Sequence, residues 1–245
     1  MKVLKNKYIL ITAGHKRVGK AIAMHLAGLG ANIFITYGQD EKTAIETSSE
    51  IRKLGAKVSA FHLDQSDINS VKELVKNIYA ATEHIYGLVN NAAIFYKTPV
   101  RDISENDFDN FINTNLKGPF FLAKLIGEKM FANGEGRIVN IADVSVDKVW
   151  MDYIPYTISK AGIVAMTKGL AKAFAPHVLV NAVSPGTVML ADNYDAAEEQ
   201  YLIDRTPLKK TGTPDHIAST VTFLMSGNDF IHGTVINVDG GRSIT

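Results

Sequence analysis

YILITAGHKRVG, residues 8–19, joins a short apolar run to a glycine-containing turn, and a segment of helical period follows at residues 18–29. The apolar run predicts a buried strand, and the 3.6-residue period after the turn predicts a helix. Backbone amides and the positive end of that helix would favour a pyrophosphate group in the turn. Taken alone, the turn is a weak signal and is also compatible with an ordinary strand-to-helix connection.

The same alternation of strand and helix continues along the chain and predicts a parallel sheet flanked by helices rather than a sandwich or a bundle. The expected strands are residues 8–12, 32–36, 58–62, 87–90, 137–141, 179–183 and 234–238, and the expected helices are residues 18–29, 41–54, 68–80, 105–131, 156–175 and 214–225. The predicted fold class is α/β, a single doubly wound domain over residues 1–245 with a seven-stranded parallel sheet. Residues 187–213 are polar, include an expected short helix at 195–200, and are interpreted as an active-site lid.

Composition excludes several classes of protein. The 245 residues carry a net charge of +1 and no cysteine, so we expect no nucleic-acid partner, no disulfide and no thiolate metal site. No histidine pair has metal-ligand spacing, and no metal is expected. The sequence shows neither a signal peptide nor an apolar window long enough to cross a membrane, and these features predict a cytoplasmic protein without a membrane partner.

Tyr156 and Lys160 are four residues apart, and Asp143 precedes the tyrosine by thirteen. On a helix, this spacing places the phenol and the ammonium group on one face. A nearby cation stabilises phenolate, so the tyrosine can give up and recover a proton more easily. The trio therefore predicts a proton donor for a reduction, although a Tyr–Lys pair at this spacing also arises by chance.

The residues after the second expected strand bear on cofactor choice. An acid there favours a free ribose 2′-hydroxyl, whereas basic residues favour a 2′-phosphate. The segment after Ile35 reads Thr36-Tyr37-Gly38-Gln39, with no carboxylate before Asp40, while Lys16 and Arg17 add positive charge to the first turn. This pattern favours NADPH over NADH, although both cations could also lie on a solvated loop.

These residues resemble the short-chain dehydrogenase/reductase family from Tyr8 almost to Thr245. The matching positions are the glycine turn, Asp64, Asn90-Asn91-Ala92-Ala93, Asn115, Tyr156 with Lys160, Ser184-Pro185-Gly186 and Asp239-Gly240-Gly241. The resemblance implies a Rossmann fold, a nicotinamide cofactor and a homotetramer packed through the long helices. It assigns proton donation to Tyr156, the nicotinamide ribose to Lys160 and support of a water relay to Asn115. The implied cofactor-binding set is Gly14, Lys16, Arg17, Val18, Gly19, Asp64, Asn91, Tyr156, Lys160, Pro185, Gly186 and Val188.

Three departures from the common family pattern resemble the pteridine reductases. Arg17 replaces the middle glycine of the turn, Asp143 replaces the usual serine, and Asn91-Ala92-Ala93 is followed by Phe95-Tyr96-Lys97-Thr98-Pro99. In that branch a phenylalanine stacks on the pterin, so Phe95, Arg17, Asp143 and Tyr156 are the expected substrate-binding residues. We therefore expect NADPH-dependent reduction of a C=N bond in a dihydropterin or dihydrofolate, with Tyr156 and Asp143 supplying the proton.

Two other functions stay open at this point. A 3-oxoacyl-carrier-protein reductase or general carbonyl reductase is disfavoured by Asp143, because an ionised carboxylate repels a developing oxyanion. A non-catalytic NADPH-sensing regulator is disfavoured by the presence of Asn115, Tyr156 and Lys160. The individual residues also have structural alternatives: Phe95 could be a core aromatic, Asp143 a helix cap and Arg17 a clamp on a carboxylate.

Overall fold

Seven strands form one parallel sheet in a computed structural model that describes residues 3–189 and 195–245. The order across the sheet is β3-β2-β1-β4-β5-β6-β7. The strands are β1 (Tyr8–Ile11), β2 (Asn32–Tyr37), β3 (Val58–His62), β4 (Gly87–Asn90), β5 (Gly136–Ile141), β6 (Val178–Pro185) and β7 (Val235–Val238). All seven expected strands are confirmed, with ends that shift by at most two residues.

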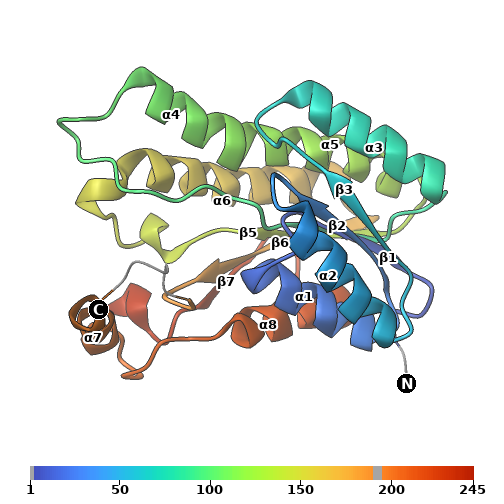
Figure 1. Cartoon of the computed structure of the whole chain (residues 1–245). Coiled ribbons are helices and arrows are strands. Elements are labelled where there is room, and N and C mark those ends of the chain that lie inside the picture. Colours follow the sequence, from blue (N-terminus) through green and yellow to red (C-terminus); the bar gives the residue numbers. More distant parts are fainter. Residues whose placement is uncertain (1–2, 190–194) are drawn as a thin grey trace.

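Helices cover both faces of this sheet, as Figure 1 shows. One layer holds α1 (Arg17–Gly28), α2 (Glu41–Lys53) and α8 (Pro214–Ser226). The other holds α3 (Ile68–Ala81), α4 (Glu105–Ile112), α5 (Gly118–Ala132) and α6 (Ile154–Phe174). Helix α7 (Ala196–Asp204) lies near the C-terminus.

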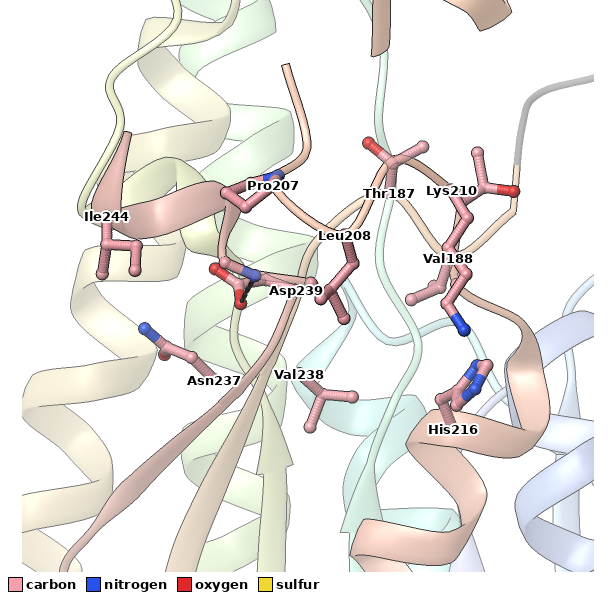
Figure 2. Close-up of a pocket in the computed structure, with 14 residues that line it drawn as sticks. Thr187, Val188, Pro207, Leu208, Lys210, His216, Asn237, Val238, Asp239 and Ile244 are labelled. Carbon is pink, nitrogen blue, oxygen red and sulfur yellow. Dashed lines mark hydrogen bonds between the residues drawn. The ribbon is translucent and has the colours of Figure 1, made fainter. Parts of the chain in front are cut away.

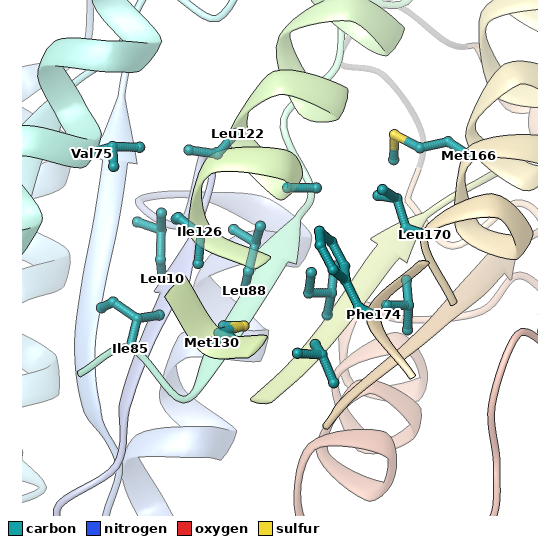
Figure 3. Packing of buried hydrophobic residues seen from close by; sticks show 14 of the residues in the cluster. Leu10, Val75, Ile85, Leu88, Leu122, Ile126, Met130, Met166, Leu170 and Phe174 are labelled. Atoms are coloured by element: carbon teal, nitrogen blue, oxygen red, sulfur yellow. The ribbon is translucent and has the colours of Figure 1, made fainter. Parts of the chain in front are cut away.

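The alternation of side chains along each strand builds two cores. Leu10 on β1 packs with residues of α3, α5 and α6, the cluster shown in Figure 3, whereas its neighbours Ile9 and Ile11 pack with residues of α1, α2 and α8. Strands buried on both faces are typical of parallel sheets, and they explain why the strands read as continuous apolar runs. The architecture is therefore the expected single Rossmann-like α/β domain.

The strand order changes direction between β1 and β4: β2 and β3 lie on one side of β1, and β4 to β7 lie on the other. Loops that follow these two strands separate there and leave a crevice at the carboxyl ends of the strands. The segments after β1, β4, β5 and β6 all meet at this edge, so residues from four distant parts of the sequence can share one site.

The expected long helix at residues 105–131 is interrupted. A π-helical turn, η1 (Asn113–Lys117), separates α4 from α5. Short 3₁₀ turns also precede α6, at η2 (Val144–Val146) and η3 (Met151–Tyr153), and close the chain at η4 (Arg242–Ile244). Of the expected lid at 187–213, residues 190–194 lie outside the described residues; α7 occupies the place of the short helix expected at 195–200. The lid role stays a prediction.

Among residues 3–189 and 195–245, no helix combines the length and the apolar character needed to cross a bilayer.

Candidate active site

The glycine turn has the backbone geometry of a tight phosphate-binding loop. Ala13 and Arg17 adopt left-handed φ values of 48° and 51°, a conformation that normally favours glycine. A Cβ atom on Gly14 would lie 2.6 Å from Ile35 Cγ2, so only glycine fits there. Helix α1 begins at Arg17, and its N-cap Lys16 makes no side-chain capping hydrogen bond. The turn therefore suits an anion bound by backbone amides.

Strand β4 braces this turn through Asn91. The Asn91 side-chain amide donates to the Thr12 carbonyl oxygen at 2.9 Å, and the Thr12 hydroxyl accepts from the backbone amides of Asn91 and Ala92, also at 2.9 Å. Sequence reasoning gave Thr12 no functional role, because its hydroxyl serves a segment almost eighty residues away. The expected role of Asn91 in lining the cofactor channel stays a prediction.

The residues expected near the adenosine end are tied into local structure. Asp40 caps α2 by accepting from the Thr43 amide at 3.1 Å, and hydrogen bonding by the side chain and then the amide of Thr43 lowers the pKa of the carboxyl group. Asp64 accepts from the amide and hydroxyl of Ser66. The Asp40 carboxylate is thus occupied in capping α2, and no other acid directly follows β2.

Asp143, Tyr156 and Lys160 come together where β5 ends and α6 begins. The Tyr156 hydroxyl donates to Asp143 Oδ2 at 2.8 Å, while Asp143 Oδ1 accepts from the Ser145 amide at 2.7 Å. Lys160 Nζ donates to the Ile141 carbonyl oxygen at 2.9 Å and lies 5.7 Å from the centre of the Tyr156 ring. The carboxylate therefore caps η2 and also holds the phenol, so the capping alternative and the site role coexist.

Burial controls the ionisation of this trio. Burial raises the pKa of the Asp143 carboxyl group, although the Ser145 amide and Lys160 oppose the shift. Burial and the Asp143 charge raise the Tyr156 pKa well above its usual value. Burial lowers the Lys160 pKa to about 8, against the pull of Asp143. In the absence of a bound ligand, the phenol is therefore protonated and its proton is directed at the carboxylate.

Asn115 lies in the π-helical turn and contacts the loop after β4. Its side chain accepts from the Ile94 amide at 2.9 Å and donates to the Ile94 carbonyl oxygen at 3.0 Å; a longer contact of 3.3 Å reaches the Ser159 hydroxyl. The π turn that carries Asn115 is therefore bonded to the loop after β4. The expected water relay to Lys160 stays a prediction.

An aromatic wall of Phe95, Trp150 and Tyr153 lies beside Tyr156 in the same pocket. Phe95 is 45% exposed and stacks on Tyr153 with ring centres 4.6 Å apart, while Trp150 and Tyr156 meet it edge-on at 6.4 and 4.8 Å. Phe95 is therefore not a core aromatic. Trp150 and Tyr153 were missed in the sequence, since no motif marks the loop between β5 and α6.

One pocket of about 680 Å³ collects most of the expected site. Its lining includes Arg17, Val18, Asn91, Phe95, Asp143, Tyr156, Lys160, Pro185, Gly186 and Val188. Gly14, Lys16, Gly19, Asp64 and Asn115 do not line it; the glycines shape the turn and Asn115 lies behind the loop. The pocket is large enough for a nicotinamide ring and a substrate together. Its polar side chains, among them Tyr156 and Lys160, suit a nicotinamide nucleotide.

A second pocket of about 520 Å³ adjoins the first and shares Thr187 and Val188 with it. Figure 2 shows Val238 and Asp239 at the end of β7 on one side of this pocket and His216 on α8 on the other. Asp239 accepts from the amides of Gly241 and Ser243, so its carboxylate holds the C-terminal turn. In the described part of the chain, no group of histidine and acidic side chains is placed to hold a metal ion.

The fold and the Tyr–Lys–Asp site together define a dinucleotide-binding oxidoreductase. A family model described as Enoyl-(Acyl carrier protein) reductase matches residues 13–243. The chain belongs to the short-chain dehydrogenase/reductase family, whose enzymes use NAD or NADP as cofactor.

Several relatives match almost the whole chain. A hydroxy(phenyl)methylsuccinyl-CoA dehydrogenase subunit from Thauera aromatica is 35% identical and covers 98% of both chains. A 3-oxoacyl-acyl-carrier-protein reductase from Aquifex aeolicus (strain VF5) is 33% identical over 97% of this chain and 98% of its own. A solved structure described as a short-chain alcohol dehydrogenase, from Sinorhizobium meliloti 1021, superposes with a TM-score of 0.92 at 30% identity and covers 99% and 98% of the two chains.

The expected pterin function is wrong. The matching relatives are named as 3-oxoacyl-acyl-carrier-protein reductases and as dehydrogenases of other hydroxyl compounds. Arg17, Phe95 and Asp143 led to the pterin assignment, but Phe95 and Asp143 have local roles here that do not require a pterin. Asp143 caps η2 and holds Tyr156, and Phe95 completes an aromatic wall that can cover any apolar group.

Proposed function

We propose that this protein is an NADPH-dependent oxidoreductase that interconverts a ketone and a secondary alcohol. The observation that carries the proposal is the 2.8 Å hydrogen bond between Tyr156 and Asp143 in the pocket, with Lys160 beside the phenol. A phenol next to an ammonium group can donate its proton to a carbonyl oxygen and take it back from an alcohol.

The bound cofactor would supply hydride to the carbonyl carbon. Tyr156 donates a proton to the carbonyl oxygen, and the Lys160 charge stabilises the phenolate that remains. In the site without substrate, Asp143 accepts the Tyr156 proton as a carboxylate. When the phenol turns to a carbonyl oxygen, a protonated Asp143 would donate a hydrogen bond to the same oxygen, and burial raises the pKa of its carboxyl group in that direction. In that protonated form, Asp143 would replace the usual serine without repelling the developing negative charge.

The names of the relatives favour carbonyl and alcohol substrates. They act on 3-oxoacyl thioesters, a phenyl-substituted hydroxyacyl-CoA and, in a protein from Bacillus subtilis (strain 168) that is 31% identical over 97% of this chain, 2-dehydro-3-deoxy-D-gluconate. NADPH is preferred because Lys16 and Arg17 carry positive charge and no acid directly follows β2.

The test compares NADPH and NADH oxidation with acetoacetyl thioester, ethyl acetoacetate and a panel of aryl ketones. We expect turnover with NADPH, and a 10²- to 10⁴-fold lower kcat in Tyr156→Phe, because the variant lacks the proton donor. NADPH binding, measured by its fluorescence, should change little. Equal turnover by the variant would remove Tyr156 from the mechanism, and NADPH binding without turnover of any ketone or alcohol would contradict the proposed function.

A further inference from the structure

Two arginines enter the active-site pocket from the C-terminal part of the chain. Arg205 follows α7, and Arg242 begins η4; both line the same pocket as Asp143 and Tyr156. Arg242 is only 8% exposed. Within residues 3–189 and 195–245, neither guanidinium group forms an ion pair or a hydrogen bond with a carboxylate, and the contact found for Arg205 is its stacking 4.3 Å from the centre of the Tyr201 ring.

This arrangement costs stability in the absence of a ligand. Burial and the neighbouring charge of Arg205 both lower the pKa of Arg242. A buried cation normally has an acidic partner, because removing it from water is expensive. Two guanidinium groups close together are instead the usual receptor for a carboxylate or a phosphate, which can bind both through charge-assisted hydrogen bonds.

The fold holds Arg242 in place for such a role. Gly240 and Gly241 have left-handed φ values of 63° and 87°, and the Asp239 carboxylate accepts from the amides of Gly241 and Ser243. The resulting turn packs against η2, directly after Asp143. Arg242 therefore belongs to the side of the pocket where Asp143 and Tyr156 face a substrate.

We propose that Arg205 and Arg242 together bind a carboxylate or phosphate group of the substrate, whose reacting carbonyl lies against Tyr156 and Asp143. The inference rests on the proposed ketone–alcohol chemistry and narrows it to oxo acids and their hydroxy counterparts. The aromatic wall of Phe95, Trp150 and Tyr153 covers the apolar part of such a molecule. Removing one guanidinium group weakens binding of the anion, because the anion then keeps only one of its two cationic hydrogen-bond partners.

The first experiment measures binding without turnover. Trp150 is the single tryptophan of the chain and lies in the pocket, so its fluorescence reports ligands there. Titrations use benzoate, phenyl phosphate and the neutral benzamide. We expect one of the two anions to bind at least 10-fold more tightly than benzamide, and its identity distinguishes a carboxylate from a phosphate substrate. Equal affinity for all three would overturn the proposal.

The second experiment measures selectivity in catalysis. The substrates are benzoylformate, 3-benzoylpropionate and 4-benzoylbutyrate, each compared with its methyl ester, so that the distance between ketone and carboxylate varies. We expect the ratio of kcat/KM for acid over ester to exceed 10 in the wild type and to fall toward 1 in Arg242→Met and Arg205→Met. Arg205 is exposed, so its variant keeps the test valid if Arg242→Met does not fold.

Arg52→Met is the matched control, since Arg52 lies near the end of α2 and does not line the pocket. An acid-over-ester ratio that stays unchanged in both pocket variants would overturn the two-arginine site. Failure of every ketone with NADPH would instead contradict the proposed function, and the fluorescence titrations would still decide whether the two arginines bind an anion.

Discussion

At the scale of single residues, the site is a set of coupled charges held out of water. Asp143 and Lys160 stabilise each other's charged forms, and burial together with the Asp143 charge acts on the Tyr156 phenol. The Asp143 carboxylate raises the pKa of the Tyr156 phenol. The Lys160 charge would lower that pKa once bound cofactor and substrate bring it to bear on the phenol. The resting protein thus keeps the proton on Tyr156 until a carbonyl oxygen can accept it.

The buried Lys160 should make stability depend on pH. Its pKa is about 8 in the folded protein, against 10.5 for an unperturbed lysine, so the unfolded chain binds more protons between these values. Stability must therefore rise with pH across this window and fall as Lys160 gains its proton. We expect a gain of about 1.5 kcal/mol between pH 8 and 9.5, measured by urea unfolding, from the size of the pKa difference.

Lys160→Met should abolish that rise, because it removes the titrating group. Lys168→Met is the control: Lys168 lies on the same helix but is exposed, so the pH dependence should match that of the wild type. A rise of the same size in Lys160→Met would show that another group causes it.

Single residues were also where sequence reasoning succeeded and failed. The spacing of Tyr156 and Lys160 is a local property of one helix, so the sequence predicted that they share a pocket. The arginine pair was missed because Arg205 and Arg242 are far apart in sequence and meet only through tertiary structure. The pterin assignment failed because Arg17, Phe95 and Asp143 indicate a pocket with charge and an aromatic face. They do not indicate which molecule binds in it.

At the scale of elements, periodicity predicted all seven strands, because strands buried on both faces form apolar runs. It did not predict the break between α4 and α5. The π-helical turn adds one residue to a turn without changing the apolar pattern enough to be recognised. This break matters for the site, since Asn115 within it bonds to the loop that carries Phe95.

Close packing of Gly118 at the start of α5 should maintain that turn. A Cβ atom at position 118 would overlap the backbone oxygen of Gln65. The Gln65 side chain donates to the carbonyl oxygens of Ala92 and Thr114, so it ties the loop after β4 to the π turn. We expect Gly118→Ala to lower the free energy of unfolding by about 1–3 kcal/mol, the usual cost of overpacking.

Thermal unfolding and kcat measure this effect, and Gly28→Ala provides the control. Gly28 also lies in a helix, but a Cβ atom there would meet nothing within 4 Å. The control should be as stable as the wild type or slightly more so, since alanine favours helix more than glycine does. Equal stability of the two variants would mean that the contact with Gln65 relaxes at no cost.

At the scale of the whole molecule, the helical layer of α4, α5 and α6 leaves large apolar side chains uncovered. Phe120 on α5 is 39% exposed and Ile158 on α6 is 44% exposed, although α5 and α6 pack side by side. Large apolar side chains exposed on neighbouring helices are candidates for an interface between protein molecules. The homotetramer implied by the family resemblance stays a prediction, and in it these helices would pack against those of a neighbour.

Phe120→Asp should therefore reduce the molar mass measured by light scattering after size exclusion, because a carboxylate buried in an interface has no partner. We expect the tetramer to give way to dimers or monomers that keep the far-ultraviolet circular dichroism of the folded chain. Ile45→Asp on α2 is the matched control: Ile45 is 61% exposed but lies in the opposite helical layer, so its variant should stay tetrameric. A wild-type protein that elutes as a monomer would contradict the assembly, and an unchanged mass for Phe120→Asp would show that the tetramer uses a different surface.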